Sequence, residues 1–239
     1  MQTALPVALS AQIAQQHRLD ALADNVANAA SPGFLATKLR FAEAVERHGG
    51  PSIAFVRTGE THLSHARGSL TRTDAPLDFA VRGEAWLAID TPDGRVLTRD
   101  GRTQLLASGQ LVTLEGHAVL DPGGAPVILD PALGAPIAGA DGSLLQDGRP
   151  VASIGLFEVD RPPARRWGNS GVISDAPPRP VIGRTDVSLV QGFVEGANVN
   201  PVEQMVRLIE VSRSFETLNG LVTRADSTLA DSLRTLAAQ

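Results

Sequence analysis

The segment that decides the fold closes the sequence: residues 201–236 read PVEQMVRLIEVSRSFETLNGLVTRADSTLADSLRTL. Its apolar residues recur three and four positions apart, which is typical of a helix that packs along one heptad seam. The members of this seam are Leu208, Val211, Phe215, Leu218, Val222, Ala225 and Leu229. Asn200-Pro201 supplies a capping residue and a first-turn proline. The sequence therefore predicts one long helix whose seam needs a partner.

The beginning of the chain provides a candidate partner. Residues 5–30 favour helix, and Leu19, Leu22 and Val26 lie on one face of it. Because Pro32 disfavours helical backbone at the residue before it, this helix is expected to end near residue 30. We predict that the two terminal helices pair along their apolar faces.

The middle of the chain follows a different pattern. From residue 71 to residue 190, short alternating runs are separated by turn signals. The run FAVRGEAWLAI at residues 79–89 reads as two strands across Gly83. Turn dipeptides of the Asp-Gly type stand at residues 93–94, 100–101, 141–142 and 147–148. Such close spacing of turns predicts a compact antiparallel β domain.

Together these patterns predict an α+β fold, in which long N- and C-terminal helices pair as a coiled-coil-like hairpin around an inserted antiparallel all-β domain. The expected parts are an N-terminal helix at residues 1–33, a connecting segment at 34–75, the β domain at 76–190, and a connecting strand with the C-terminal helix at 191–239. Each buried seam residue contributes roughly 1.5–3 kcal/mol, whereas ordering the backbone costs roughly 1–2 kcal/mol per residue. We therefore expect the terminal helices to depend on other subunits for their order.

Composition narrows the classes of partner. The chain has 239 residues, 43% hydrophobic and 20% charged, which is ordinary for a globular protein. Its net charge of -5 and its aromatic content of 4% argue against a nucleic-acid partner. The absence of cysteine excludes disulfides and thiol chemistry. No window approaches the roughly 18 apolar residues of a membrane span, and the first residues lack the pattern of a cleaved signal peptide.

The sequence offers no complete catalytic pattern. His62 and His65 have the spacing of metal ligands, and with Asp74 they define the alternative of a secreted metal-dependent cell-wall hydrolase. No cysteine or HExxH motif completes such a site, and no phosphate-binding loop or nucleophile elbow is present. We therefore predict a protein that is not an enzyme, with no catalytic residue, cofactor, metal or small-molecule substrate.

Two asparagines near the end of the first helix require a reason. Asn25 and Asn28 lie three apart on its last turn, directly before Pro32, Gly33 and Phe34. Each amide is able to bond backbone groups of a neighbouring chain. The alternative is that Asn28 only terminates the helix and Asn25 lies in water. Gly33 permits a turn with positive φ, after which Phe34 is expected to fold back onto the apolar face.

Three blocks of this sequence resemble those of the bacterial flagellar rod and hook proteins. ADNVANAASPGF at residues 23–34 is similar to the N-terminal ANNxANxxTPGF signature of that family. PLDFAVRGEAWLAI at residues 76–89, followed by TRDG at 98–101, is similar to its PLDxAIxGxGFFxV and YTRxG blocks. EGANVNPVEQMVRLIEVSRSF at residues 195–215 is similar to its C-terminal SNVxxxxEMxxLIxxQRxYE pattern.

The resemblance implies a structural subunit of the flagellar basal-body rod, which polymerises into the axial tube that transmits torque from motor to hook. The short length and single β region resemble a proximal-rod subunit, with a distal-rod subunit as the alternative. The expected partners are copies of the chain, other rod proteins and the flagellar type III export apparatus. Export without a cleaved signal peptide would bring the chain to the periplasmic part of the rod.

Resemblance and pattern together assign the subunit contacts to the helices and to the segments beside them. The expected contact residues are Asn25, Asn28, Pro32, Gly33, Phe34, Asn198, Asn200, Met205, Leu208, Val211, Phe215, Leu218, Val222 and Leu229. A free-standing coiled-coil adaptor whose β domain binds a peptide is a further alternative.

Overall fold

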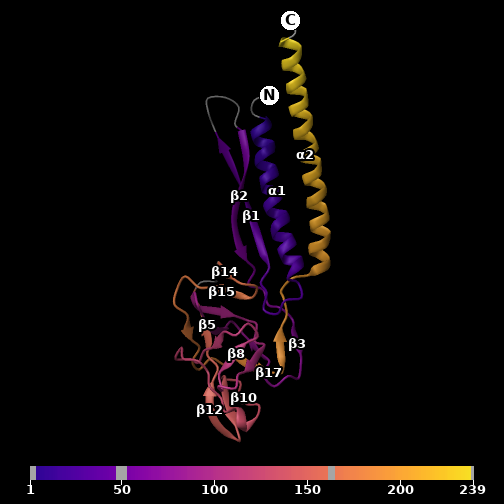
Figure 1. Cartoon of the computed structure of the whole chain (residues 1–239). Helices are drawn as coiled ribbons and strands as arrows, with labels where there is room; N and C mark the ends of the chain where they lie inside the picture. Colours follow the sequence, from indigo (N-terminus) through magenta and orange to yellow (C-terminus); the bar gives the residue numbers. More distant parts are fainter. Residues whose placement is uncertain (1–3, 47–52, 161–164, 238–239) are drawn as a thin grey trace. The chain divides into compact units, whose positions relative to one another are not determined.

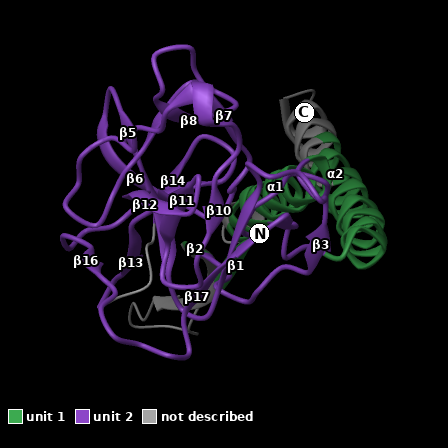
Figure 2. Cartoon of the chain, turned by 90° about the horizontal axis from the view of Figure 1, so that it is seen from below, with its two compact units in different colours: residues 1–27, 37–62, 200–239 green, residues 28–36, 63–199 purple. Residues whose placement is uncertain are grey.

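The computed structural model describes residues 4–46, 53–160 and 165–237. The chain folds into two compact units, drawn in different colours in Figure 2. Unit 1 comprises residues 1–27, 37–62 and 200–239, and unit 2 comprises residues 28–36 and 63–199. The chain therefore passes from one unit to the other four times, and each unit is described by itself.

Unit 1 contains α1 (Ala4–Ala27) and α2 (Pro201–Ala237), which lie side by side (Figure 1). The pair is antiparallel, because Gln12 Nε2 donates to Asn219 Oδ1 at 2.8 Å and Asn25 Nδ2 donates to Gln204 Oε1 at 3.3 Å. Asn200 caps α2 as predicted: its Oδ1 accepts the Glu203 amide, and its carbonyl accepts the Gln204 amide.

The seam of α2 is the less exposed side of that helix. Val211 is buried, and four further members of the predicted seam are partly buried: Leu208, Phe215, Leu218 and Val222. On α1, Ala14 and Leu22 are buried. The side chains of Ala225 and Leu229 lie outside the described residues.

Unit 1 also contains a long β-hairpin, β1 (Thr37–Glu46) with β2 (Ile53–Leu63), and this overturns the predicted fold class. The prediction of a helical hairpin around one β domain is wrong. The described residues form only two α-helices, and the remaining regular structure is a large antiparallel β-rich body. The error arose because TKLRFAEAVE at residues 37–46 mixes the alternation of a strand with Ala, Glu, Lys and Arg, which favour helix.

Unit 2 is built from short antiparallel strands. Its largest sheet has the order β14-β15-β6-β5-β9-β8-β7, and β13 pairs with both β5 and β16. The strands of this sheet are β5 (Trp86–Thr91), β6 (Gly94–Thr98), β7 (Thr103–Leu105), β8 (Leu111–Thr113), β9 (Ala118–Val119), β13 (Leu156–Glu158), β14 (Arg165–Trp167), β15 (Gly171–Ile173) and β16 (Arg179–Pro180).

Three small sheets complete unit 2. The first has the order β10-β11-β12, and the others pair β17 with β4 and β18 with β3. Their strands are β3 (Leu70–Arg72), β4 (Phe79–Arg82), β10 (Ile137–Ala138), β11 (Ser143–Gln146), β12 (Arg149–Ser153), β17 (Ser188–Gln191) and β18 (Phe193–Glu195). A 3-10 turn, η1 (Pro131–Leu133), precedes β10.

Apolar side chains cover both faces of the central strand β5. Leu87 and Ile89 belong to one buried cluster, whereas Trp86 and Ala88 belong to another. Because successive residues of a strand point to opposite faces, both sides of this sheet are core. The predicted pair of strands across Gly83 is confirmed, since β4 and β5 flank this glycine at φ +90°.

At three of the four predicted Asp-Gly pairs the glycine has a positive φ, and the first is Gly94 at the start of β6, with φ 100°. Asp147 and Gly148 adopt φ values of 49° and 72° between paired Gln146 and Arg149, as a two-residue hairpin of type I′ requires. Gly142 has φ 90° in the turn between β10 and β11. These turns explain why the strands of unit 2 are short.

Candidate functional site

The three sequence blocks that carry the family resemblance meet at one place in unit 2. We call this place the junction and define it as residues 33–36, 64–68, 99–101 and 195–198. Its members come from distant parts of the chain, and they are joined by backbone hydrogen bonds, by side chains that bond to backbone groups and by ion pairs.

The loop after α1 forms the first part of the junction. α1 ends at Ala27, slightly before the predicted end, and the Ser31 amide donates to the Asn28 carbonyl at 2.9 Å. Gly33 has the predicted positive φ, +69°, and its amide donates to the Glu195 carbonyl at 2.8 Å. A Cβ on Gly33 would lie 2.4 Å from the amide nitrogen of Asp100, so only glycine fits at this close approach.

The prediction that Phe34 folds back onto the apolar face of the first helix is wrong. Its side chain is buried within unit 2 instead. The Arg166 guanidinium lies over its ring, with Cζ 4.1 Å from the ring centroid, and Arg166 Nη2 donates to the Leu35 carbonyl. The prediction was wrong because Arg166 is 132 residues away in sequence, and no local pattern pairs the two residues.

Asn198 connects three segments of the junction. Its Oδ1 accepts the Ala36 amide at 2.6 Å, and its Nδ2 donates to the carbonyls of Ser64 and Ala66 at 2.7 and 2.8 Å. Its own amide donates to the Phe34 carbonyl at 3.1 Å. Both donor hydrogens and the acceptor oxygen of the Asn198 side-chain amide are therefore used within the chain.

Glu195 places a carboxylate inside the junction, and this residue is only 2% exposed. Its Oε1 accepts the Gly68 amide at 3.1 Å and the Arg99 Nη1 group at 3.4 Å. Its Oε2 lies 3.5 Å from Arg67 Nη1. Arg99 also lies over the Trp86 ring, with Cζ 4.2 Å from the centroid. A buried carboxylate is tolerated when charges and donors surround it in this way.

Burial lowers the pKa of the Arg99 guanidinium below its ordinary value, and the Glu195 carboxylate opposes that shift. The charges of this cluster are therefore mutually dependent: removal of Glu195 would leave Arg99 buried without its counter-ion. Sequence reasoning missed Glu195, Arg99 and Arg67. Glu195 and Arg99 follow short apolar runs, which is equally typical of solvated residues, and Arg67 stands among small and polar residues without any such signal.

Asn25 has its own partner in unit 1. It is 3% exposed, its Nδ2 donates to the Thr37 carbonyl at 2.9 Å, and its Oδ1 accepts the Thr37 amide at 2.8 Å. The side-chain amide thus pairs with Thr37 as a strand would. Asn28 is partly buried, and its Oδ1 bonds the Ser31 hydroxyl. Pro32 is partly buried as well. These bonds lie within one chain, and Asn25 does not lie in water.

The predicted contact residues of α2 divide into two groups. The seam residues face inward, whereas Met205 is half exposed beside three further exposed apolar residues, Val202, Val206 and Ile209. We call these four residues the outer stripe. Their spacing of three and four places them largely on the side of α2 away from the seam. The stronger heptad signal concealed the outer stripe in the sequence.

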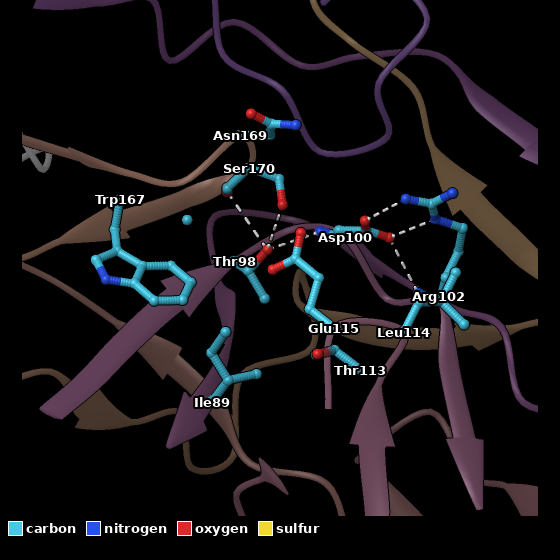
Figure 3. A pocket seen from close by; sticks show the side chains of 11 residues that line it. Ile89, Thr98, Asp100, Arg102, Thr113, Leu114, Glu115, Trp167, Asn169 and Ser170 are labelled. Atoms are coloured by element: carbon cyan, nitrogen blue, oxygen red, sulfur yellow. Dashed lines mark hydrogen bonds and ion pairs between the residues drawn. The ribbon is translucent and has the colours of Figure 1, made fainter. Parts of the chain in front are cut away.

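Unit 2 contains a small hollow, and Figure 3 shows the side chains that line it. Arg102 forks onto Asp100 at 2.9 and 2.7 Å, and these bonds raise the pKa of Arg102 above its ordinary value. Thr98 Oγ1 donates to the Ser170 carbonyl at 3.3 Å. The volume of about 40 Å³ is far below the roughly 300–1,000 Å³ of a small-molecule site.

The residues of the hydrolase alternative do not form a site. Across residues 4–46, 53–160 and 165–237, no group of three or more His, Cys, Asp or Glu side chains is placed to hold a metal ion. Asp74 Oδ1 instead accepts the Arg72 Nε group at 2.6 Å, and His65 lies edge-on to Trp86. In the same described part of the chain, neither α-helix has the length and apolarity needed to span a membrane.

Comparison with known families gives two matches, one at each end of the chain. The model described as "Flagella basal body rod protein" matches residues 5–34. The model described as "Flagellar basal body rod FlgEFG protein C-terminal" matches residues 190–235. The two matched ranges contain both Asn25 and Asn198.

Individual relatives extend the similarity over the whole chain. The flagellar basal-body rod protein FlgF of Mesorhizobium japonicum is 51% identical over 239 residues, which cover 99% of this chain and 98% of the relative. The FlgF of Rhizobium meliloti is 44% identical over 237 residues, with 99% and 98% covered. The FlgF of Caulobacter vibrioides is 33% identical over 226 residues, with 91% of each chain covered.

Proposed function

The chain belongs to the flagellar basal-body rod protein family, as a structural subunit of the rod, and we propose that it builds the proximal rod through its outer stripe. A subunit of this family assembles with other rod proteins in the basal body. Proximal placement is supported by full-length similarity to three FlgF proteins. The distal rod is the alternative.

The outer stripe is the observation that carries the proposed mode of assembly. Val202 is 70% exposed and Ile209 is 53% exposed, although both belong to a regular array with Met205 and Val206. Single exposed apolar residues are common on protein surfaces, but four at helical spacing form a continuous face. Covering this face would contribute roughly 1.5–3 kcal/mol for each fully buried side chain.

Self-association by this face generates a rod when the two surfaces in contact are different. A heterologous interface that does not close into a ring produces a helical assembly. Leu9 and Ile13 are exposed on α1 and supply a second apolar surface within unit 1. In this proposal Met205 contacts a neighbouring subunit directly. The seam residues Leu208, Val211, Phe215, Leu218, Val222 and Leu229 contribute by holding α1 and α2 together.

The other predicted contact residues act through the shape of the chain in this proposal. Asn25 and Asn28 fix the end of α1, and Asn200 fixes the start of α2. Pro32, Gly33, Phe34 and Asn198 hold the loop within unit 2. In this proposal each residue supports assembly by fixing the conformation of the segment that follows α1 or the segment that precedes or begins α2.

We further propose that the chain reaches the rod through the flagellar type III export apparatus, without a cleaved signal peptide, and functions in the periplasm as a protein that is not an enzyme. The structural character of the family supports the last statement. The absence of cysteine suits passage through an export channel, because no disulfide can form before export. Mass spectrometry of the chain recovered from purified basal bodies tests the intact N-terminus, and a truncated N-terminus contradicts it.

The decisive test removes the apolar character of the outer stripe. The double variant Val206→Asp and Ile209→Asp keeps the seam intact, so its circular dichroism and melting temperature should match those of the unaltered chain. In cells that depend on this chain for their rods, it should abolish rod assembly and motility. Ser214→Asp is the matched control, because Ser214 is exposed on the same helix outside the outer stripe. Normal rods in the double variant would contradict the proposal.

A further inference from the structure

The course of the chain determines where a force applied to its ends enters unit 2. Unit 2 begins at residue 28, directly after α1, and ends at residue 199, directly before α2. Any pull transmitted through the two helices therefore reaches unit 2 through the loop at residues 28–36 and through the segment at residues 195–199.

These two entry segments are bonded directly to each other. The Gly33 amide donates to the Glu195 carbonyl at 2.8 Å, and the Asn198 amide donates to the Phe34 carbonyl at 3.1 Å. The Ala36 amide donates to Asn198 Oδ1 at 2.6 Å. Both segments advance in the same sequence direction along these contacts. Pulling the N-terminal end of one and the C-terminal end of the other therefore shears the three bonds together, instead of opening them one after another.

The remaining segment that enters unit 2 is tied to the same residues. After β2, the Ser64 amide donates to the Ala36 carbonyl at 2.8 Å. Asn198 Nδ2 donates to the carbonyls of Ser64 and Ala66, and the Gly68 amide donates to Glu195 Oε1. A load on any one entry segment is thus shared with the others through Glu195 and Asn198.

Close packing prevents these segments from sliding. A Cβ on Gly68 would lie 1.9 Å from the Gly196 carbonyl oxygen, and a Cβ on Gly33 would lie 2.4 Å from the Asp100 amide nitrogen. Phe34 is buried beneath Arg166. A segment that slides would have to displace these close neighbours.

We propose that the junction is a mechanical clamp, in which Asn198 is a positioning residue that makes unit 2 resist force applied through the chain ends. The proposal rests on the assigned function, because a rod subunit experiences torque. It goes beyond that function by stating which bonds carry the load. Unit 2 has many other hydrogen bonds, but those between residues 33–36 and 195–198 lie directly between the two points of loading.

The test is single-molecule pulling of the full chain by its two ends, with a variant and a matched control. Asn198→Ala removes three side-chain bonds to the backbone at the junction. Gln146→Ala also removes three bonds to the backbone, those of a buried amide with Asp130 and Gly134, far from the entry segments in sequence. The two variants should lower the thermal stability of unit 2 by similar amounts.

Under force the two variants should differ. Asn198→Ala should unfold unit 2 about 10- to 100-fold faster at a given force, the factor expected for the loss of three hydrogen bonds. Gln146→Ala should change that rate by less than about threefold, because its bonds are not loaded first. Should Asn198→Ala fail to fold, Asn198→Asp retains the acceptor for Ala36 and loses the donors to Ser64 and Ala66, and it should accelerate forced unfolding by an intermediate factor.

Equal acceleration by the Asn198 and Gln146 variants would show a merely structural role and overturn the proposal. An unchanged rate in the Asn198 variant would overturn it as well. Because pulling uses the isolated chain, failure of the clamp would leave the rod assignment standing. Failure of the outer-stripe variants to disturb rods would equally leave the clamp measurement standing.

Discussion

The two units of this chain differ in how far they bury their apolar side chains. Unit 1 has long regular elements, helices of 24 and 37 residues and strands of 10 and 11, but exposes the outer stripe. Unit 2 has strands of two to six residues, yet it buries apolar side chains on both faces of its central sheet. Regular structure and a completed core are therefore separate properties, and the more irregular unit is the more self-sufficient one.

Among the changes that separate the two units, replacement of Gly33 by valine should have the largest effect, a loss of stability in unit 2. The new Cβ would overlap the backbone of Asp100, and a β-branched residue resists φ +69°. We expect the free energy of unfolding to fall by more than about 4 kcal/mol. Urea unfolding monitored by the fluorescence of Trp86 and Trp167 measures this loss.

Gly220→Val is the control for that variant. Gly220 lies in α2, where an added Cβ meets no atom within 4 Å, and valine is slightly better than glycine in a helix. Its stability should stay within about 0.5 kcal/mol of the unaltered chain. A small loss for Gly33→Val would show that unit 2 is more adaptable than its packing indicates.

Leu218→Asp should affect unit 1 alone. Leu218 lies on the partly buried seam, where its side chain contributes part of the roughly 1.5–3 kcal/mol of a fully buried leucine and a carboxylate would be poorly solvated. We expect circular dichroism at 222 nm to fall while the tryptophan melting curve of unit 2 stays unchanged, and cells should form no rods. Coincident loss of both signals would show that the units fold as one cooperative body.

Asn200→Ala should have the smallest effect, at the start of α2. The Asn200 side chain accepts the Glu203 amide, and loss of such a cap costs roughly 0.5–2 kcal/mol. The helical signal should melt a few degrees earlier, and Asn200→Ser, which retains a capping oxygen, should restore it. An unchanged melting curve in the alanine variant would indicate that packing of α2 outweighs its cap.

The sequence predicted features whose determinants lie within a few residues of each other. The spacing of Val211 and Phe215 marked the helix and its inward face, and Gly83 marked the break between β4 and β5. The helix was placed well because a 3.6-residue period repeats many times over its length, and the turn was placed well because glycine tolerates positive φ at little cost.

The features that were missed depend on partners distant in sequence. Arg99 and Glu195 are 96 residues apart, and Asn198 and Ala36 are 162 residues apart. Nothing local distinguishes a buried glutamate from a solvated one before the partners are known. The β1–β2 hairpin was missed for a different reason: its strand alternation is carried by residues that also favour helix.

The composition of unit 1 sets an order of events in time. This unit combines residues 1–27 with residues 200–239, whereas unit 2 is made of residues 28–36 and 63–199, which lie between them in the sequence. A polypeptide threaded through a narrow channel from its amino end has therefore released all of unit 2 before α1 meets α2. The helix pair of unit 1 therefore depends on a segment that follows unit 2 in the sequence, and pairing of α1 with α2 has to wait until unit 2 has passed.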